Sequence, residues 1–244
     1  MFALGRGGSV IAVTRYCTEP AVGVRRLERI GGTKNPDVAR ICALQPDLVI
    51  VNAEENRKED FEALEHAGLT IFVSFPLRVR NVAGLLLRLG ELVGARAGAE
   101  EFAQEQDDTL RHFGSAGKPR LLRVFCPIWR NPWMSFNQDT YGHDILWLAG
   151  GENVCATRGA RYCEVTLEEV AATAPQVILL PDEPYRFTPK VLSGLELLRD
   201  TPAWRTNRIH FIDGKAVSWY GTRTAMALRA LRAYFNAEEF RGAG

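Results

Sequence analysis

The sequence predicts an α/β protein built from two similar lobes, and three observations support this prediction. Short apolar runs alternate with amphipathic helical segments, which is typical of parallel sheets with right-handed crossovers. The segment 78–113 carries no strand signal and separates two such alternating regions. A proline, a buried strand and a glutamate follow one another on each side of it, at Pro46–Glu54 and Pro175–Glu183, which indicates a duplicated unit.

The first region contains three expected strands and two expected helices. Asn35 is an N-cap residue type and Pro36 suits the first helical position, so a helix is predicted to begin there. Gly68 ends the second helix. The expected strands are Ser9–Val13, Asp47–Val51 and Leu69–Val73, and the expected helices are Asn35–Leu44 and Arg57–Ala67.

The middle segment is predicted to be helical throughout. Apolar residues from Ala99 to Phe113 fall on one face at helical spacing, whereas glycines interrupt the apolar stretch Val79–Val93. The pattern leaves open one long helix or two joined ones. The predicted domain organisation is therefore a first lobe over 1–77, a linking helix over 78–117 and a second lobe over 118–244.

The second region repeats the alternation of strands and helices. Thr166 and Glu169 have the spacing of a capping box, which predicts a helix start at that point. Gly150 and Gly151 end the helix before it. The expected strands are Leu121–Phe125, Val177–Leu180 and Arg208–Ile212, and the expected helices are Thr140–Leu148, Thr166–Thr173, Pro189–Arg199 and Thr222–Phe235.

Composition excludes several classes of protein. The 244 residues are 46% hydrophobic and 24% charged with a net charge of +1, so a strongly basic nucleic-acid-binding protein is not expected. No apolar run reaches the ~18 residues of a membrane span. The chain has no phosphate-binding loop, dinucleotide fingerprint or nucleophile-elbow motif. No metal site and no cofactor are predicted, because the four histidines are scattered.

The five cysteines have no metal-binding spacing either. Cys155 and Cys163 are two candidates for a disulfide in an oxidising compartment. Buried free thiols are the alternative.

Aromatic residues gather on the loops that follow the predicted strands. Open α/β sheets bind ligands at the carboxyl ends of their strands, where the loops Asn52–Arg57 and Pro181–Phe187 lie. Aromatic side chains at such positions either bind a flat, partly apolar ligand or cover the core beneath the loops, and both interpretations stay open. These residues are Tyr16, Trp129, Trp133, Phe136, Tyr185, Phe187, Trp219 and Tyr220.

Five segments together resemble one family. The segments are Val13–Pro20, Gly31–Asp37, Leu44–Val49, Gly150–Val154 and Ser218–Arg223. They are similar to periplasmic substrate-binding proteins of iron–siderophore and cobalamin ABC importers, especially the cobalamin-binding type. The resemblance implies two Rossmann-like lobes with parallel sheets joined by one long helix, the class III arrangement. It also implies a periplasmic, monomeric, non-enzymatic receptor that holds a corrinoid or ferric siderophore between its lobes and delivers it to a permease and its ATPase.

The resemblance also suggests which residues bind the ligand. Tyr16, Tyr162 and Trp219 match aromatic positions of the cobalamin-binding type, whereas a tryptophan of those relatives falls near Thr33. The ligand therefore need not be cobalamin. Together with polar residues of the strand-end loops, the candidate ligand-binding set is Tyr16, Asn52, Glu55, Asn56, Trp133, Tyr162, Trp219, Tyr220 and Arg223.

Permease docking in this family implies one carboxylate on each lobe. Glu168 occupies the position in the second lobe, seven residues before a proline. The equivalent position of the first lobe is Ala39, and Asp37 lies two residues earlier as a substitute. For both acids the alternative role is stabilisation of a helix N-terminus.

Relatives of this type begin with a signal peptide, a strand and a helix, and Met1 falls inside that helix. The expectation is a gene product that starts upstream, with a gap or an exposed apolar face beside Ser9–Val13. The alternative is a cytosolic protein with a rebuilt first lobe.

A second functional hypothesis is a two-lobed α/β enzyme that acts on a bulky small molecule. Such an enzyme needs a base or nucleophile with a shifted pKa at the strand ends.

Overall fold

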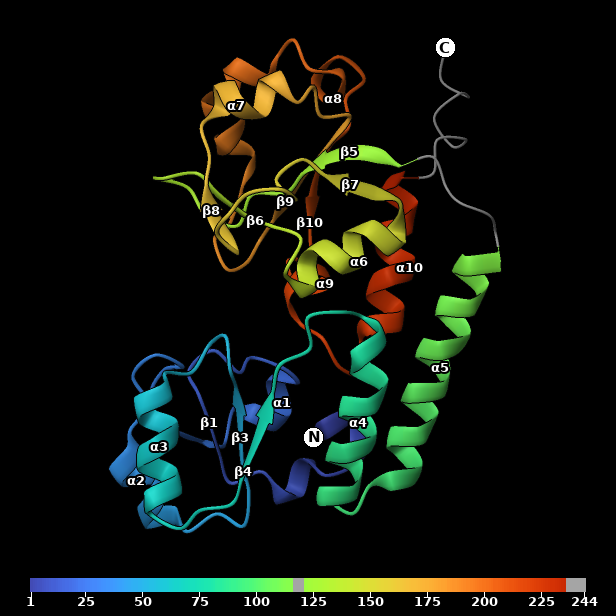
Figure 1. The fold of residues 1–244 in the computed structure, drawn as a ribbon. Coiled ribbons are helices and arrows are strands. Elements are labelled where there is room, and N and C mark those ends of the chain that lie inside the picture. Colours follow the sequence, from blue (N-terminus) through green and yellow to red (C-terminus); the bar gives the residue numbers. More distant parts are fainter. Residues whose placement is uncertain (116–120, 236–244) are drawn as a thin grey trace. The chain divides into compact units, whose positions relative to one another are not determined.

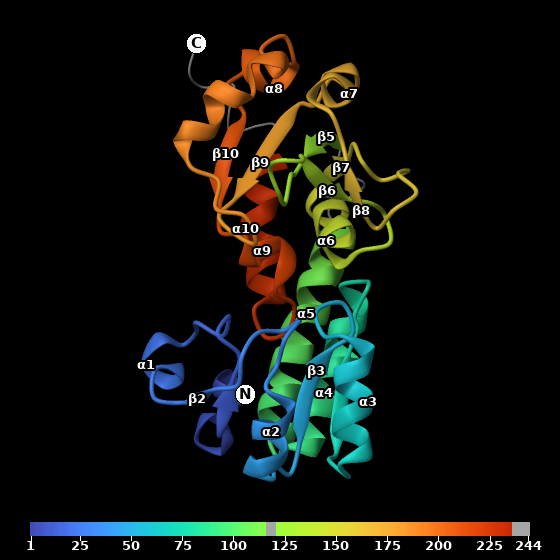
Figure 2. The ribbon, with the colours of Figure 1, turned by 90° about the vertical axis from the view of Figure 1, so that its left-hand side faces the viewer.

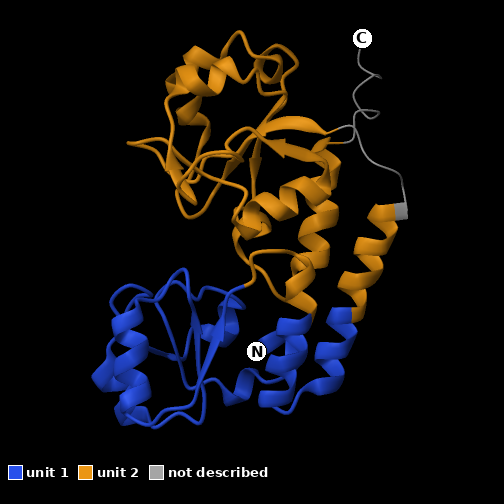
Figure 3. Cartoon of the chain, in the orientation of Figure 1, with its two compact units in different colours: residues 1–75, 84–103 blue, residues 76–83, 104–244 orange. Residues whose placement is uncertain are grey.

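A computed structural model describes residues 1–115 and 121–235, which form two compact units (Figure 3). Unit 1 comprises residues 1–75 and 84–103, and unit 2 comprises 76–83 and the described residues from 104 onward. The middle segment forms two helices, α4 (Arg80–Leu92) and α5 (Arg96–Ser115), rather than the single helix implied by the resemblance. The break falls at Gly94, whose φ of 65° lies in the left-handed region that ends helices. The domain boundaries at 78 and 117 stay a prediction.

Unit 1 contains two pairs of parallel strands. β1 (Ala12–Val13) pairs with β2 (Glu28–Arg29), and β3 (Val49–Asn52) pairs with β4 (Ile71–Ser74) (Figure 1). Among the described residues, no hydrogen-bonded ladder joins the two pairs.

Some apolar side chains on or beside these strands are only partly covered. Ile11, which precedes β1, is 49% exposed, and Ile50 and Val73 are each 44% exposed, whereas Val51 and Phe72 are buried. The expected strand Ser9–Val13 shrinks to β1, because Gly7–Ser9 forms a 3-10 turn.

Unit 1 includes parts of α4 and α5 and several shorter helices. The shorter ones are α1 (Ala21–Val24), α2 (Val38–Leu44) and α3 (Lys58–His66), preceded by 3-10 turns at Phe2–Leu4 and Gly7–Ser9. The N-cap of α2 is Asp37 instead of the predicted Asn35, because the Asp37 carboxylate accepts a hydrogen bond from the Arg40 amide at 2.9 Å. The Asn35 carbonyl instead closes a turn by accepting from the Gly32 amide at 3.3 Å.

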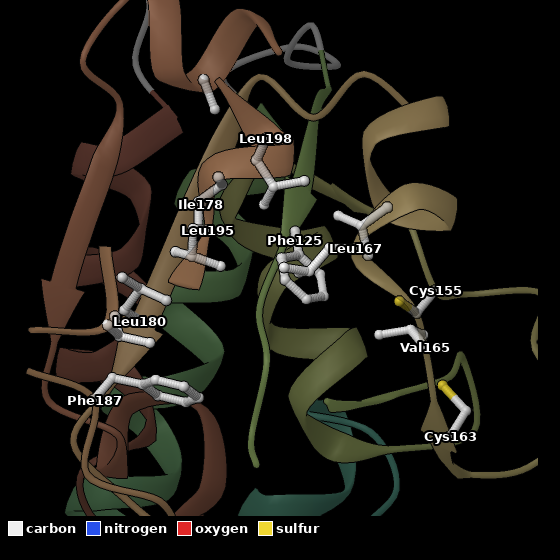
Figure 4. Packing of buried hydrophobic residues seen from close by; sticks show 13 residues of the cluster. Phe125, Cys155, Cys163, Val165, Leu167, Ile178, Leu180, Phe187, Leu195 and Leu198 are labelled. Carbon is white, nitrogen blue, oxygen red and sulfur yellow. The ribbon is translucent and has the colours of Figure 1, made fainter. Parts of the chain in front are cut away.

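Unit 2 has a continuous parallel sheet in the order β10–β9–β5–β7. The strands are β5 (Leu122–Phe125), β7 (Gly151–Asn153), β9 (Val177–Pro181) and β10 (Ile209–Ile212). Every residue of β9 is buried, as its apolar run predicts. Figure 4 shows the apolar cluster on one side of this sheet, where Ile178 and Leu180 meet Leu195 and Leu198.

Two further strands of unit 2 are antiparallel and were not predicted. β6 (Met134–Phe136) pairs with β8 (Tyr162–Glu164), in a register that places Ser135 opposite Cys163. Asn153 ties this pair to the end of β7, because its side-chain amide donates to the Phe136 carbonyl at 2.8 Å.

The helices of unit 2 confirm most of the predicted ones. They are α6 (Tyr141–Ala149), α7 (Leu167–Ala172), α8 (Pro202–Arg205), α9 (Lys215–Ser218) and α10 (Thr224–Phe235). The expected helix Pro189–Arg199 is instead a pair of 3-10 turns, Pro189–Gly194 and Glu196–Leu198, because Gly194 interrupts it after one short run. None of the helices in the described ranges has the length and apolar character of a membrane span.

Helix α7 is held at both ends. The predicted capping box is present, with Thr166 Oγ1 accepting from the Glu169 amide at 3.2 Å and Glu169 Oε2 accepting from the Thr166 amide at 3.0 Å. At the other end, the Arg123 guanidinium from β5 donates to the Thr173 and Ala174 carbonyls. Within unit 2, α7 and α9 lie at opposite ends (Figures 1 and 2).

Candidate functional site

In unit 1, hydrogen bonds from polar side chains connect the loops at the carboxyl ends of the strands. The Asn56 side chain accepts from the Asn52 amide at 2.8 Å and donates to the Thr33 carbonyl at 3.1 Å. Lys34 Nζ donates to the Glu54 carbonyl at 2.7 Å. The loop after β2 is thereby fixed to the loop after β3, which places the position near Thr33 beside the expected ligand-binding residues.

Three of the candidate binding residues of unit 1 belong to this network. Asn52 and Asn56 form loop-shaping hydrogen bonds, with Asn52 Oδ1 accepting from the Glu54 amide at 2.7 Å. Glu55 accepts from the Thr33 hydroxyl at 3.4 Å. Tyr16 differs from them because it is 60% exposed, with the Arg15 guanidinium 5.9 Å from its ring centroid. Their ligand-binding roles stay a prediction.

In unit 2, charged side chains gather where β9 and β10 end. Lys215 Nζ lies 3.9 Å from the Glu183 carboxylate and 3.5 Å from that of Asp213, and the Ser218 hydroxyl donates to Glu183 at 3.3 Å. Burial raises the pKa of Glu183, while Lys215 and the Ser218 hydroxyl oppose this rise. The Gly214 backbone approaches so closely that a Cβ there would lie 2.4 Å from the Glu183 carbonyl oxygen. Only glycine therefore permits this close approach.

Trp219 joins this group through two cations. The Lys215 ammonium lies 5.7 Å and the Arg223 guanidinium 5.4 Å from its ring centroid. Lys215, Trp219 and Arg223 follow one another at intervals of four residues. The first interval is formed by α9. We call Glu183, Lys215, Ser218, Trp219 and Arg223 the strand-end cluster. It combines a flat aromatic surface with two cations, of which Lys215 is paired with Glu183, and this set suits a planar ligand with polar groups.

Tyr220 is half-buried and contacts helix α6. Its ring lies 5.7 Å from the Tyr141 ring at 66°, and the buried Tyr141 hydroxyl is 3.2 Å from the Thr224 hydroxyl. Burial raises the pKa of Tyr141, so its phenol stays neutral. Tyr220 is thus packed beside the strand-end cluster, next in sequence to Trp219.

The remaining predicted aromatics divide into packed and exposed side chains. The Trp133 ring stacks parallel to the Phe187 ring, with 5.8 Å between their centroids, and packs against the apolar cluster. This environment agrees with a side chain that covers the core. Trp129 meets Tyr185 edge-on at 5.4 Å. Tyr162, on β8, is 44% exposed. A ligand contact of Trp133 or Tyr162 stays a prediction.

A cavity of about 640 Å³ lies elsewhere in unit 2, beside β7 and α6. His143 and Trp147 line it, with ring centroids 6.3 Å apart. Burial lowers the pKa of His143, and its Nδ1 has no hydrogen-bond partner among the described residues. None of the candidate ligand-binding residues lines this cavity.

The two candidate docking acids have different surroundings. Asp37 is exposed, but its carboxylate caps α2, which is the alternative role named for it. Glu168 is exposed in the first turn of α7, and no hydrogen bond or ion pair engages its carboxylate among the described residues. Within the described ranges, no three His, Cys, Asp or Glu side chains come together as a metal site.

Part of the strand-end cluster is predictable from the sequence. Trp219 and Arg223 are candidate ligand-binding residues, and Glu183 ends the repeated strand motif. Lys215 was missed, although its spacing of four residues from Trp219 was a usable signal.

Two α/β units with aromatic and charged loops at their strand ends define a class of small-molecule-binding proteins. The chain belongs to the periplasmic binding protein family, whose model matches residues 1–216. Relatives include vitamin B12-binding proteins of Yersinia pestis (strain Pestoides F) and Yersinia pseudotuberculosis serotype O:1b (strain IP 31758). Each is 29% identical over 183 residues, which cover 73% of this chain and 64% of the relative. The match thus spans less than two thirds of those relatives.

Solved structures show the same fold. The periplasmic vitamin B12 binding protein of Vibrio cholerae has a TM-score of 0.82 at 21% identity, with 96% of this chain and 91% of that chain covered. The periplasmic heme-binding protein from Roseiflexus sp. RS-1 in apo form has a TM-score of 0.83 at 24% identity, with coverages of 96% and 92%. The α/β class with two lobes and parallel sheets, expected from the sequence, is confirmed.

Proposed function

We propose that this protein is the solute-binding receptor of an ABC importer and that it captures a metal chelate. The family membership and the B12-binding relatives support the receptor role. The observation that carries the ligand class is the Trp219 ring with Lys215 and Arg223 beside it. A corrinoid or a ferric siderophore offers a broad surface for the ring and polar or anionic groups for the cations.

Fluorescence titration tests this function and ranks the ligands. Cyanocobalamin, hemin and a ferric catecholate siderophore are each added to the purified protein, and quenching of its five tryptophans is followed. Trp219→Ala is expected to weaken binding of the preferred chelate by about 1–3 kcal/mol, as the loss of an anchoring aromatic does. Trp147→Ala is the matched control, because Trp147 is 47% exposed on α6 and outside the strand-end cluster. Failure of all three chelates to quench contradicts the proposal.

An enzyme is the competing function, and Glu183 is the observation in its favour. A carboxyl with a raised pKa beside a hydroxyl and an ammonium has the elements of an acid–base site. In the receptor these groups only hold and orient the ligand. The chelate recovered after prolonged incubation is therefore expected to have unchanged mass and absorption spectrum. A converted product would favour the enzyme.

Glu168 is the proposed contact to the permease. Its carboxylate is exposed in the first turn of α7. Helix α7 lies at the opposite end of unit 2 from α9 (Figure 2). Glu168→Lys is expected to abolish stimulation of the transporter's ATPase in proteoliposomes and to leave chelate binding intact. Glu101→Lys reverses another exposed acid and is expected to do neither. Equal loss of binding and stimulation would contradict a docking role, and Asp37→Lys tests the weaker candidate in the same assay.

The remaining part of the proposal concerns where the protein acts and in which state. We propose a monomeric periplasmic protein, which its membership of the periplasmic binding protein family supports. Cell fractionation and size-exclusion chromatography test these two points. A cytosolic protein, or a dimer in solution, contradicts them.

A further inference from the structure

Two cysteines of unit 2 are held against each other by the backbone around them. Cys155 follows β7, and its amide donates to Asn153 Oδ1 at 3.0 Å. The same Asn153 side chain donates to the Phe136 carbonyl on β6 at 2.8 Å. β6 in turn pairs with β8, which carries Cys163 opposite Ser135. One asparagine therefore fixes the Cys155 backbone to the strand pair that carries Cys163.

The two side chains point into the same apolar cluster. Figure 4 shows both cysteine side chains beside Val165, at the same edge of the cluster. Cys155 is 2% and Cys163 5% exposed, and each thiol is within hydrogen-bonding reach of the other. Both are free thiols in the reduced protein.

We propose that Cys155 and Cys163 form an intramolecular disulfide when the chain folds in the presence of a disulfide donor. The thiolate of one cysteine attacks a sulfur of the donor, and one donor thiol leaves. The second cysteine then attacks the resulting mixed disulfide and releases the other donor thiol. The two cysteines lose two protons and two electrons, and the donor disulfide is reduced to two thiols. This site does not depend on the proposed receptor function.

Burial determines when the bond forms. Desolvation raises the pKa of Cys155 to about 11 and also raises that of Cys163, so the folded, reduced protein presents almost no thiolate at neutral pH. Oxidation therefore accompanies folding, while the thiols are still accessible. Once formed, the disulfide is shielded from external thiols by the same burial.

A third thiol, Cys126, is the competing partner. It is fully buried after β5 and interacts electrostatically with Cys155. It lies outside the apolar cluster that contains the other two, whereas the Cys155 thiol interacts with the Ser135 hydroxyl and with the Cys163 thiol. The geometry therefore favours the pairing of Cys155 with Cys163.

The bond would close a short loop that contacts α7 and carries Tyr162, a candidate ligand-binding residue. Residues 156–162 carry Arg158, which pairs with Glu169 at 3.1 Å, and end at the exposed Tyr162. Arg158 thereby links this loop to the capping box of α7. Oxidation would fix Tyr162 and the start of α7 through one covalent link.

Tryptic mapping identifies the pairing directly. Arg123, Arg130, Arg158, Arg161 and Arg186 place the three cysteines in separate peptides, 124–130, 131–158 and 162–186. The denatured protein is refolded with reduced and oxidised glutathione, its free thiols are blocked with iodoacetamide under denaturing conditions, and the digest is compared with and without reduction.

The expected result is a linked pair of 131–158 and 162–186 that separates on reduction. The Tm of the oxidised protein is expected to exceed that of the reduced protein by about 5–10 °C, because the crosslink restricts the unfolded chain. Cys163→Ala should abolish both the linked pair and the Tm difference. Free thiols at both positions, or a link from 131–158 to 124–130, would overturn the proposal. The mapping needs only the wild-type chain, so a poorly folding variant does not prevent the test.

Discussion

Unit 1 and unit 2 both contain short parallel strands, but these strands are paired differently in the two units. In unit 2, β10, β9, β5 and β7 form one ladder, and β9 is buried throughout. In unit 1, the strands described form separate pairs, and Ile50 and Val73 each remain 44% exposed. Similar local sequence patterns thus produce different degrees of burial, because burial depends on how many neighbours a strand finds.

Amide hydrogen exchange should show the largest difference between the units. Amides of β9 lie between two strands, whereas β3 pairs with β4 alone among the strands that the structure describes. Peptides covering 177–181 are therefore expected to exchange about 100-fold more slowly than peptides covering 49–52, since local opening limits exchange. Mass-spectrometric exchange at neutral pH measures this ratio. Equal protection would mean that unit 1 is as cooperative as unit 2.

The same substitution in both sheets compares their cores in energy. Ile178 is fully buried in the apolar cluster, so Ile178→Ala should lower the free energy of unfolding by about 2–5 kcal/mol. Ile50→Ala removes a half-exposed side chain and should cost less than about 1 kcal/mol. Urea denaturation measures both values. A large effect at Ile50 would show that its side chain is covered in solution.

The stability lost when a helix cap is removed should differ little between the units. Asp37→Ala removes one cap hydrogen bond from α2, and Thr166→Ala breaks the reciprocal box of α7. Each change is expected to lower stability by about 1 kcal/mol, with Thr166→Ala at least as costly. Thermal unfolding followed by circular dichroism checks this. Comparable losses would assign the contrast between the units to their sheets, whereas a much larger loss at Asp37 would assign part of it to the helices.

The smallest expected effect is a pair of opposite pH dependences. Burial raises the pKa of Glu183 above its ordinary value of 4.5, so its contribution to stability is present at low pH and is lost as pH rises through the folded-state pKa. In unit 1, hydrogen bonding from Arg40 lowers the pKa of the exposed Glu28, so its contribution is lost as pH falls. Glu183→Gln and Glu28→Gln should therefore shift the slope of Tm between pH 3.5 and 6.5 in opposite directions. Slopes shifted in the same direction would contradict these signs.

Most strands could be predicted because their residues form apolar runs. β3, β5, β9 and β10 lie within or beside the predicted runs. β2 and β7 could not be predicted, since Glu28–Arg29 and Gly151–Asn153 are too short and polar to show a strand period. Their pairing depends on partners distant in sequence, which local patterns do not encode.

The candidate site shows the same limit, because contacts between distant parts of the chain are not encoded in local sequence patterns. Trp219 and Arg223 could be proposed from residue type and from the resemblance, and the structure places both in the strand-end cluster. Their link to Glu183 through Lys215 depends on the meeting of the β9 and β10 loops. Asn56 was predicted as a ligand contact, yet its side chain spans two loops of unit 1, an interaction visible only once both loops are placed.

Because α7 is held at both ends, a partner that binds Glu168 meets a helix that is already ordered. A helix of six residues is too short to be stable by itself, and its carboxylates would ordinarily sample many orientations. Here the capping box fixes the first turn, and Arg123 anchors the last turn to the sheet. The backbone beneath Glu168 is thus ordered before any encounter. A complex formed through it would lose little conformational entropy, and its association rate would respond mainly to ionic strength.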